Sequence, residues 1–559
     1  MSLTRVSSTD QFERFDPAAG LEHRRMSFNP VTDWIPPKDN TEPLSAASVL
    51  EFEEVSKSRR LLQVAIAIIY CLFAAGIVFG YAAIKPVLID EGAFRELCTS
   101  EEVEKGVSPC YQQEIRLNLM FTVAAVSTNV AALPIGTILD RYGPRVCGII
   151  SSVLLFAGAA LFSFASSIDG DAYTPAYFLL ALGGPFVFIS SFQLSNAFPQ
   201  RSGLILALLT GAFDSSSALF LLFRVLYEKT GGQVNTENLF KIYLVVPVFI
   251  LLVQVFVMPK HSYKSVSEIV KEAEDEINAP TPPNASVEEQ ISARERREST
   301  ASEITALLEM PANTKRASRE EKKNTISGVW GAMHGHTAWE QIKSPWFLLI
   351  TLFTVVQMTR INYFVATIRS QERWLLGSEK QARKVNEFFD IALPVGGVLS
   401  IPFIGTVLDG TSTPFALACL VVVATIIGVL GCLPYTWAAV ANIVLFVLYR
   451  PFYYTAVSDY SAKVFGFVTF GKVYGLIICL AGLLNFVQSP LDALTHKTFK
   501  NNPIPVNATL TGLAVVVGTG LVSYTYIKSR NLARAKLEDE AEGATERLMP
   551  HPNGEGYGT

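Results

Sequence analysis

Long apolar runs, separated mostly by short polar turns, dominate the chain. Each run has about 19 to 25 residues, which is enough for an α-helix rising 1.5 Å per residue to cross a hydrocarbon core about 30 Å thick. Runs this long exclude a membrane barrel, whose strands need only about 10 residues. The pattern predicts an all-α membrane protein with twelve transmembrane helices, at 61–84, 115–139, 146–166, 175–195, 204–226, 240–258, 344–367, 387–408, 413–432, 436–457, 472–491 and 509–527.

The polar stretches outside these runs predict how the chain is divided. Lys57, Arg59 and Arg60 stand just before the first run and predict a cytosolic N-terminus, because basic residues are retained on the cytosolic side. Twelve spans then return the C-terminus to the cytosol. We expect a disordered N-terminal tail, a six-helix bundle, a cytosolic central loop, a second six-helix bundle and a C-terminal tail, at 1–60, 61–258, 259–343, 344–527 and 528–559.

Composition narrows the class of protein. Half of the 559 residues are hydrophobic and only 17% are charged, which is too apolar for an ordinary soluble enzyme. The net charge of −4 gives no reason to expect a nucleic-acid partner, and the seven cysteines include no CxxC pair of a zinc or redox site. We therefore expect a protein in contact with membrane lipid, with no enzymatic activity, no cofactor and no metal.

Two cysteines, Cys98 and Cys110, lie outside the apolar runs, in the predicted first outer loop. A loop on the extracellular or luminal side is in an oxidising environment, where a disulfide between them would persist. Two unpaired surface thiols are the alternative.

A charged turn between the second and third runs is repeated later in the chain. Gly136-Thr-Ile-Leu-Asp140 ends one run, and Gly405-Thr-Val-Leu-Asp409 ends another about 270 residues further on. This recurrence indicates an internal duplication. In the first copy Arg141 and Arg145 mark the cytosolic side, and Gly143 allows a tight turn.

The first copy resembles the signature loop of the major facilitator superfamily, between transmembrane helices 2 and 3. The resemblance implies a fold of two six-helix bundles that rock about a central site and expose it to each side in turn. It also implies that Asp140 and Arg141 hold the cytosolic ends of the bundles together, with Gly136 and Gly143 allowing close approach. The second copy departs from the pattern, because Gly410 and no arginine follows Asp409, so we expect a weaker contact there. The implied conformational gate comprises Gly136, Asp140, Arg141, Gly143, Arg145, Gly405 and Asp409.

Ionisable residues at membrane depth are costly and are therefore candidates for a functional site. Asp214 lies near the middle of the fifth run and Arg450 near the middle of the tenth. The alternatives are that this pair is a structural ion pair and that nearby Ser, Asn and Gln only join helices. We expect a substrate site in a central cavity formed by Asp214, Arg450, Gln193, Asn196, Tyr449, Tyr453, Tyr454 and Arg360.

The duplication pairs the fourth run with the tenth, and both carry a proline at matching places. Gly184-Pro185-Phe186 corresponds to Arg450-Pro451-Phe452. Paired prolines of this kind predict a kink or a broken helix beside a midplane binding site.

A narrower resemblance covers the second to fifth runs most densely. Leu180-Ala-Leu-Gly-Gly-Pro-Phe, Gln193-Leu-Ser-Asn-Ala-Phe-Pro199 and Gly211-Ala-Phe-Asp-Ser-Ser-Ser are similar to solute carrier family 43, and the tails are similar in style to those of fungal-type relatives. That family includes sodium-independent facilitators of large neutral amino acids and an equilibrative purine nucleobase transporter. The resemblance implies a transporter of a small organic solute, with a large neutral amino acid favoured and a nucleobase as the alternative.

The first run contains no acidic residue, where many proton symporters of the superfamily have one. This favours facilitated diffusion, although Asp214 keeps proton coupling open. A receptor or scaffold built on a transporter fold is the alternative from another class.

A short motif in the central loop bears on location. Glu303, Leu307 and Leu308 fit an acidic dileucine sorting signal, with an ordinary amphipathic patch as the alternative. As a signal it implies a sorting adaptor as partner and a vacuolar or endolysosomal membrane in preference to the plasma membrane. We expect a monomer.

Overall fold

The computed structural model describes residues 56–104, 110–168, 170–263 and 321–548, together with residues 294 and 297. These residues form helices and connecting turns, and none of them lies in a strand. Nine of the described helices are long and apolar enough to cross a membrane, or ten if the bent pair Glu379–Leu399 and Ile401–Gly410 forms one span. The sorting motif Glu303, Leu307 and Leu308, most of the predicted N-terminal tail and most of the central loop lie outside the described residues.

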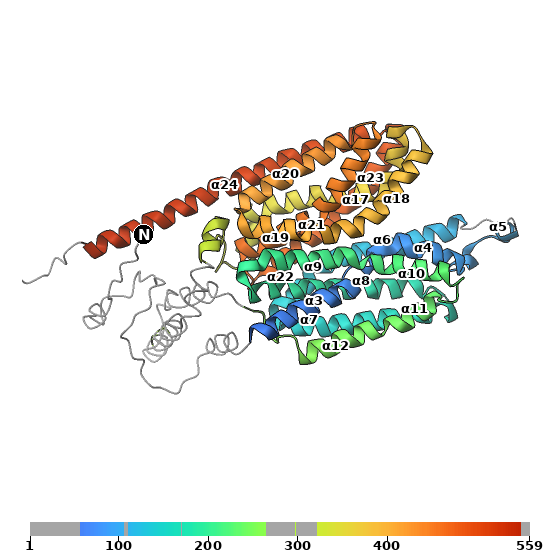
Figure 1. Ribbon diagram of the computed structural model, residues 1–559, viewed down its shortest axis with the longest axis horizontal. Helices are drawn as coiled ribbons and strands as arrows, with labels where there is room; N and C mark the ends of the chain where they lie inside the picture. Colours follow the sequence, from blue (N-terminus) through green and yellow to red (C-terminus); the bar gives the residue numbers. More distant parts are fainter. Residues whose placement is uncertain are drawn as a thin grey trace, which may run out of the picture.

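The helices form two groups that lie side by side along the molecule (Figure 1). The first group comprises α3 (Lys57–Ala74), η1 (Ile77–Gly80), α4 (Tyr81–Asp90), η2 (Arg95–Leu97), α5 (Ser100–Glu104), α6 (Tyr111–Val130), α7 (Ala132–Ser163), η3 (Ala165–Ser167), α8 (Tyr173–Ser191), η4 (Phe192–Ala197), η5 (Pro199–Arg201), α9 (Ser202–Ser216), α10 (Ala218–Lys229), α11 (Thr236–Tyr243) and α12 (Val245–Phe256).

The second group, drawn from yellow to red in Figure 1, follows the central loop. It comprises α16 (Ala338–Lys343), α17 (Pro345–Leu376), α18 (Glu379–Leu399), α19 (Ile401–Gly410), α20 (Thr413–Leu430), α21 (Thr436–Phe465), α22 (Phe470–Leu484), η6 (Asn485–Val487), α23 (Gln488–Ala493), the π-helical turn η7 (Leu494–Thr498) and α24 (Ile504–Leu548).

We name the two ends of the molecule by what they carry. The signature-loop end, at the left of Figure 1, carries the turn at Gly143 and the N-termini of α9 and α22. The disulfide end, at the right, carries α5. There the sulfur atoms of Cys98 and Cys110 are bonded, which confirms the predicted disulfide.

Each of the twelve predicted runs has a helical counterpart, although several are fused or broken. The helical run Ile115–Ser163 has 49 residues, but Gly143 inside it has φ of 82°, in the left-handed region where a helix cannot continue. Two predicted spans therefore meet there, as the turn residues indicate. The short apolar helix α22 is extended by η6 and α23. This arrangement is consistent with twelve spans.

The first span is broken, whereas neither of the paired prolines ends its helix. Pro185 lies inside α8 and Pro451 inside α21, and both helices continue past their prolines. The first span instead stops at Ala74 and resumes in η1, because Gly76 leaves the helix with φ of −129°. The Gly76 amide donates to Ser216 Oγ over 2.8 Å, so a side chain of α9 satisfies the freed backbone group.

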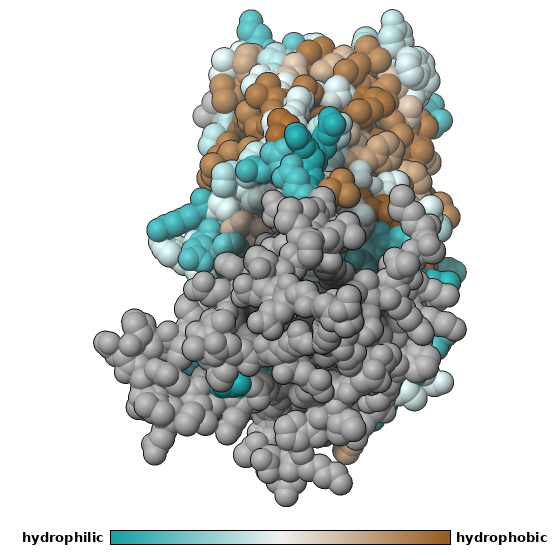
Figure 2. All heavy atoms as spheres, turned by 90° about the vertical axis from the view of Figure 1, so that its left-hand side faces the viewer, coloured by the Kyte–Doolittle hydropathy of each residue, from teal (hydrophilic) through white to brown (hydrophobic). Residues whose placement is uncertain are grey.

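Large apolar side chains on the outside of both groups are exposed, as expected of a surface that faces lipid. Phe256 is 73% exposed, Val516 70% and Val245 69%. Figure 2 looks at the signature-loop end and shows brown apolar side chains along the flanks of the second group, with hydrophilic side chains gathered nearer the viewer. The apolar band and the polar end together fit a membrane-spanning orientation along the long axis of Figure 1.

Candidate functional site

One ion pair joins the two groups of helices near the middle of the predicted fifth and tenth spans. Arg450 Nη2 on α21 lies 3.6 Å from Asp214 Oδ1 on α9, and the two side chains are 13% and 4% exposed. Asp214 also lies against α18, since a Cβ placed on Gly397 would be 3.2 Å from the Asp214 Cβ. The sequence prediction that these two residues approach each other from opposite groups is consistent with this geometry.

The three tyrosines of α21 that were predicted to line the site have different neighbours. Tyr454 lies beside the Arg450 guanidinium. Tyr453 is fully buried and its hydroxyl donates to the Thr354 carbonyl of α17 over 2.9 Å, so it joins helices within the second group. Tyr449 stacks on Tyr453 with ring centroids 6.2 Å apart, and it also lines a cavity in the second group.

That cavity holds Arg360 and lies inside the second group, between α17, α20, α21 and α24. Its walls are mainly apolar and carry a few polar groups. Arg360 donates to the Ala424 carbonyl over 2.9 Å, to Gln357 Oε1 over 3.3 Å and to Thr511 Oγ1 over 3.4 Å. The structure therefore places Arg360 apart from the Asp214–Arg450 pair, on a different face of α21.

Gln193 and Asn196 lie in η4, at the signature-loop end, and not beside the ion pair. The Tyr263 amide donates to Gln193 Oε1 over 2.8 Å, and Asn196 Nδ2 donates to the Tyr263 carbonyl over 2.9 Å. The Tyr263 hydroxyl in turn donates to Gln63 Oε1. In this structure the two side chains hydrogen-bond to the segment just after α12, the last helix of the first group. They do not lie in the central cavity where they were predicted.

The signature aspartate Asp140 caps a helix of the opposite group. Its carboxylate accepts hydrogen bonds from the Gly471 and Lys472 amides over 2.8 and 2.9 Å, at the N-terminus of α22. Unpaired amides and the helix dipole make such an N-terminus favourable for an anion. We call this contact the Asp140 cap.

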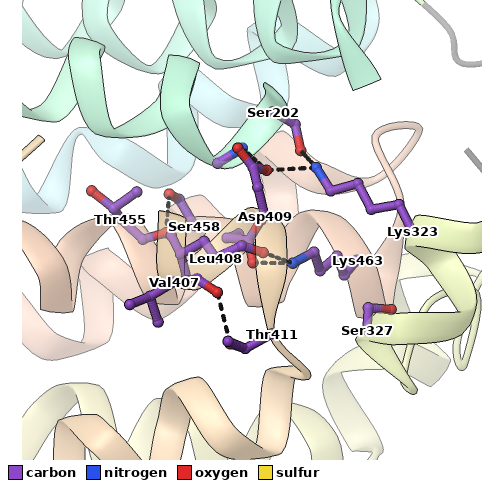
Figure 3. A network of polar contacts seen from close by, with 12 residues as sticks. Ser202, Lys323, Ser327, Val407, Leu408, Asp409, Thr411, Thr455, Ser458 and Lys463 are labelled. Carbon is purple, nitrogen blue, oxygen red and sulfur yellow. Dashed lines mark hydrogen bonds and ion pairs between the residues drawn. The ribbon is translucent and has the colours of Figure 1, made fainter. Parts of the chain in front are cut away.

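Asp409, in the second copy of the motif, makes the corresponding contact in the reverse direction (Figure 3). Its carboxylate accepts from the Gly203 and Leu204 amides of α9 over 2.9 and 3.0 Å. We call this contact the Asp409 cap. The two caps are related by the internal duplication, because each joins the end of one copy of the motif to a helix of the other group.

A lysine from the central loop completes the Asp409 cap. Lys323 Nζ donates to Asp409 Oδ1 over 2.6 Å and to the Pro199 carbonyl and Ser202 Oγ over 2.7 Å each (Figure 3). Burial lowers the pKa of the Lys323 amine below its ordinary value, and the Asp409 charge opposes that change. The expectation of a weaker second contact rested on the missing arginine after Asp409, and the structure supplies a cation from another segment.

Two glycines at each cap allow the backbones to touch. A Cβ on Gly136 would be 1.8 Å from the Gly471 carbonyl oxygen, and one on Gly471 would be 2.3 Å from the Gly136 carbonyl oxygen. Gly405 is packed against Leu204, where an added Cβ would be 2.9 Å from the nearest side-chain carbon. Of the two glycines predicted to allow close approach, Gly136 lies against the other group, and Gly405 makes a similar contact, whereas Gly143 lies against Lys260.

The arginines of the signature loop do not reach the other group in this structure. Arg141 is exposed and its guanidinium lies 5.4 Å from the centre of the Tyr142 ring. Arg145 donates to the Met258 carbonyl within the first group, and Gly143 turns the chain against the Lys260 carbonyl. Of the predicted gate residues, Asp140, Asp409, Gly136 and Gly405 join the two groups, whereas Arg141, Gly143 and Arg145 do not.

The sequence prediction missed the partners of the two aspartates. Gly203, Gly471 and Lys323 make the contacts, and Ser216 supports the break at Gly76. A signal was present for the glycines, because each stands at the start of an apolar run that the duplication relates to the other. No group of three metal-binding side chains occurs among the residues that the structure describes.

A family model described as Major Facilitator Superfamily matches residues 106–487, which is more than half of the chain. The chain belongs to the major facilitator superfamily. Protein FMP42 of Saccharomyces cerevisiae is 48% identical over 484 residues, which are 84% of this chain and 95% of that protein. The chain is therefore a membrane transporter of small solutes and not an enzyme.

More distant relatives carry names that state a substrate. The bovine Equilibrative nucleobase transporter 1 is 24% identical over 489 residues, 82% of this chain and 94% of that protein. The human Large neutral amino acids transporter small subunit 3 is 28% identical over 181 residues, 30% of this chain and 32% of that protein. These relatives confirm the resemblance to amino-acid and nucleobase carriers.

A solved structure of the proton:xylose symporter XylE has the same fold. Its TM-score to this chain is 0.53 at 12% identity, and the match covers 86% of this chain and 96% of that one. The likeness confirms the predicted all-helical major facilitator fold.

Proposed function

We propose that this transporter moves a large neutral amino acid by facilitated diffusion and alternating access. The observation that carries the proposal is the buried Asp214–Arg450 pair, which lies between the two groups of helices. A charged pair at membrane depth is expensive to maintain and usually marks a substrate path. A neutral amino acid carries one charge of each sign, so its ammonium suits Asp214 and its carboxylate suits Arg450.

The two bundles, 61–258 and 344–527, act in this proposal as the bodies that rock. The Asp140 and Asp409 caps join the bodies at the signature-loop end. With that end in the cytosol, the structure corresponds to a state closed toward the cytosol. Both caps must separate when the opposite state forms.

A nucleobase is the second candidate substrate, favoured by the name of the bovine relative and by Tyr454 beside Arg450. A base would stack on the ring and hydrogen-bond through its edge. Proton coupling, for which Asp214 would be the titrating group, is the alternative to facilitated diffusion.

The test separates a site from a scaffold. Removing one member of a buried pair strands the other charge and costs roughly 3–5 kcal/mol, so single variants are uninformative. The double variant Asp214→Asn with Arg450→Gln removes both charges. We expect it to fold and to lose leucine uptake into proteoliposomes, whereas near-normal uptake would show that the pair is structural. In the parent protein, inhibition of solute uptake by leucine but not by adenine would support an amino acid as substrate. Inhibition by adenine but not by leucine would support a nucleobase.

We also propose that the protein is a monomer of the vacuolar or endolysosomal membrane with both termini in the cytosol. The support is the acidic dileucine motif and the basic residues before the first span. A cysteine placed at Ser100, at the disulfide end, should react with an impermeant thiol reagent only from the luminal side. Labelling from the cytosolic side would overturn the orientation.

A further inference from the structure

The cavity around Arg360 is a separate feature from the ion pair between the two groups. All of its walls come from the second group, and its apolar side is formed by Ile361, Phe364, Ile427, Phe446 and Leu510. Tyr449 faces this cavity, while the next residue, Arg450, faces Asp214. A helix turns by about 100° per residue, so adjacent side chains of α21 serve two different places.

Arg360 is a buried cation that no acid of the described residues neutralises. Its hydrogen bonds go to a carbonyl, an amide oxygen and a hydroxyl, and two of the three are 3.3 Å or longer. Arg450, in comparison, has Asp214 at 3.6 Å. A guanidinium at membrane depth has a strong preference for an anionic partner, and a carboxylate matches its forked geometry.

Three further polar groups line the same cavity without a hydrogen-bond partner among the described residues. They are Gln357 Nε2, Tyr449 Oη and Asn442 Oδ1. The three residues are only 1%, 3% and 1% exposed. Buried polar groups are nearly always hydrogen-bonded, so three orphaned groups around one cavity point to a ligand that bonds to them.

The chemistry of these groups selects the class of ligand. Gln357 Nε2 is a donor and can bond a carboxylate next to Arg360, whereas Asn442 Oδ1 is an acceptor and requires a ligand donor. Tyr449 Oη can act in either sense. A ligand with a carboxylate, an ammonium and an apolar body satisfies all of these groups.

We propose that this cavity is a second binding site for a neutral amino acid, with its carboxylate on Arg360 and Gln357 and its ammonium on Asn442 and Tyr449. The inference rests on the proposed function for the class of ligand and goes beyond it in the place of binding. The apolar side chain of the amino acid contacts the apolar side of the cavity. Because α24 lines this cavity, the two sites can be distinguished by which helix the bound ligand touches.

The experiment uses the unmodified full-length protein in nanodiscs and the probe photo-leucine, a leucine analogue with a photoreactive diazirine. After irradiation, mass spectrometry locates the label. We expect labelling of the α24 segment around Leu510 and Thr511. Excess leucine should abolish this labelling, whereas excess leucinamide, which lacks the carboxylate, should not. Label confined to α9 and the Arg450 face of α21 would overturn the second site while supporting the proposed function. An absence of leucine-sensitive label would overturn the second site, and leucine uptake in proteoliposomes would then show separately whether the proposed function stands.

Two variants test the role of Arg360 directly. Arg360→Gln should reduce α24 labelling roughly 10- to 100-fold, the loss expected for hydrogen bonds to a charged group. Arg369→Gln is the matched control, because Arg369 lies on the same helix but is exposed and paired with Glu379. Equal labelling of the Arg360→Gln protein and the control would overturn the proposal.

Discussion

The Asp140 cap makes a sharp prediction about one glycine. Replacing Gly471 by Ala puts a Cβ 2.3 Å from the Gly136 carbonyl oxygen and 2.4 Å from Asp140 Oδ1. The added Cβ has no room on either side, because the first of these atoms belongs to the backbone and the second to the capping carboxylate. We expect α22 to move away from α7 and to lose the two hydrogen bonds that Asp140 accepts.

The size of the effect follows from those two bonds. A hydrogen bond to a charged group contributes about 1.5–3 kcal/mol, so losing both costs the closed end at least about 3 kcal/mol. Each 1.4 kcal/mol changes an equilibrium tenfold, so the ratio of closed to open molecules should fall roughly 100-fold. Asp140→Asn keeps the space but removes the charge, and should shift the ratio in the same direction by a smaller factor.

The measurement is the distance between spin labels at the signature-loop end. Tyr142 in the first group and Val468 beside α22 are 55% and 69% exposed, so cysteines introduced at these positions can be spin-labelled. The labelled proteins must first lose the five free cysteines Cys71, Cys147, Cys419, Cys432 and Cys479. Gly471→Ala should give a longer distance. The control is Gly512→Ala on α24, where an added Cβ meets nothing within 4 Å. Identical distance distributions for the two alanine variants would refute the reasoning.

Two other predictions concern the central loop. Lys323→Gln should lengthen the distance between the same two spin labels, because the Asp409 cap loses its cation. The control is Lys322→Gln, which changes an exposed neighbouring lysine and should leave the distance unchanged. Equal effects of the two variants would show that Lys323 has no special role. Replacing Leu307 and Leu308 by Ala should move a fluorescently tagged protein from the vacuolar or endolysosomal membrane to the cell surface, and an unchanged distribution would remove the motif as its address.

The membrane helices could be predicted from the sequence because apolar length is a local property. The duplicated Gly-Thr-x-Leu-Asp motif went further and identified both capping aspartates. The glycine amides that bind them could not be assigned, because Gly203 and Gly471 lie far from Asp409 and Asp140 in the chain. Only the packing of the two groups brings these residues together.

The polar residues of the helices were less predictable, because position along a helix does not say which side of it a side chain occupies. Tyr449 and Arg450 are adjacent but face different neighbours, so one list of site residues covered two places. Gln193 was assigned to the centre from its position in an apolar run, yet α8 ends at Ser191 and η4 turns Gln193 toward Tyr263. The break at Gly76 was missed because prolines, the usual breakers, are present elsewhere and are tolerated there.

Lys323 shows how the segment between the duplicated halves can take part in the closed state. An ammonium has three donors, and those of Lys323 have three partners: Pro199 and Ser202 in the first group, and Asp409 in the second. When the groups separate at this end, Lys323 cannot keep both sets of partners. Residues nearby attach this segment to the second group, since the Gly331 and Met333 amides donate to the Lys463 and Val464 carbonyls at the end of α21. The bonds to Pro199 and Ser202 are therefore the ones that break, and Lys323 stays with Asp409 as the cation that the second copy of the motif lacks.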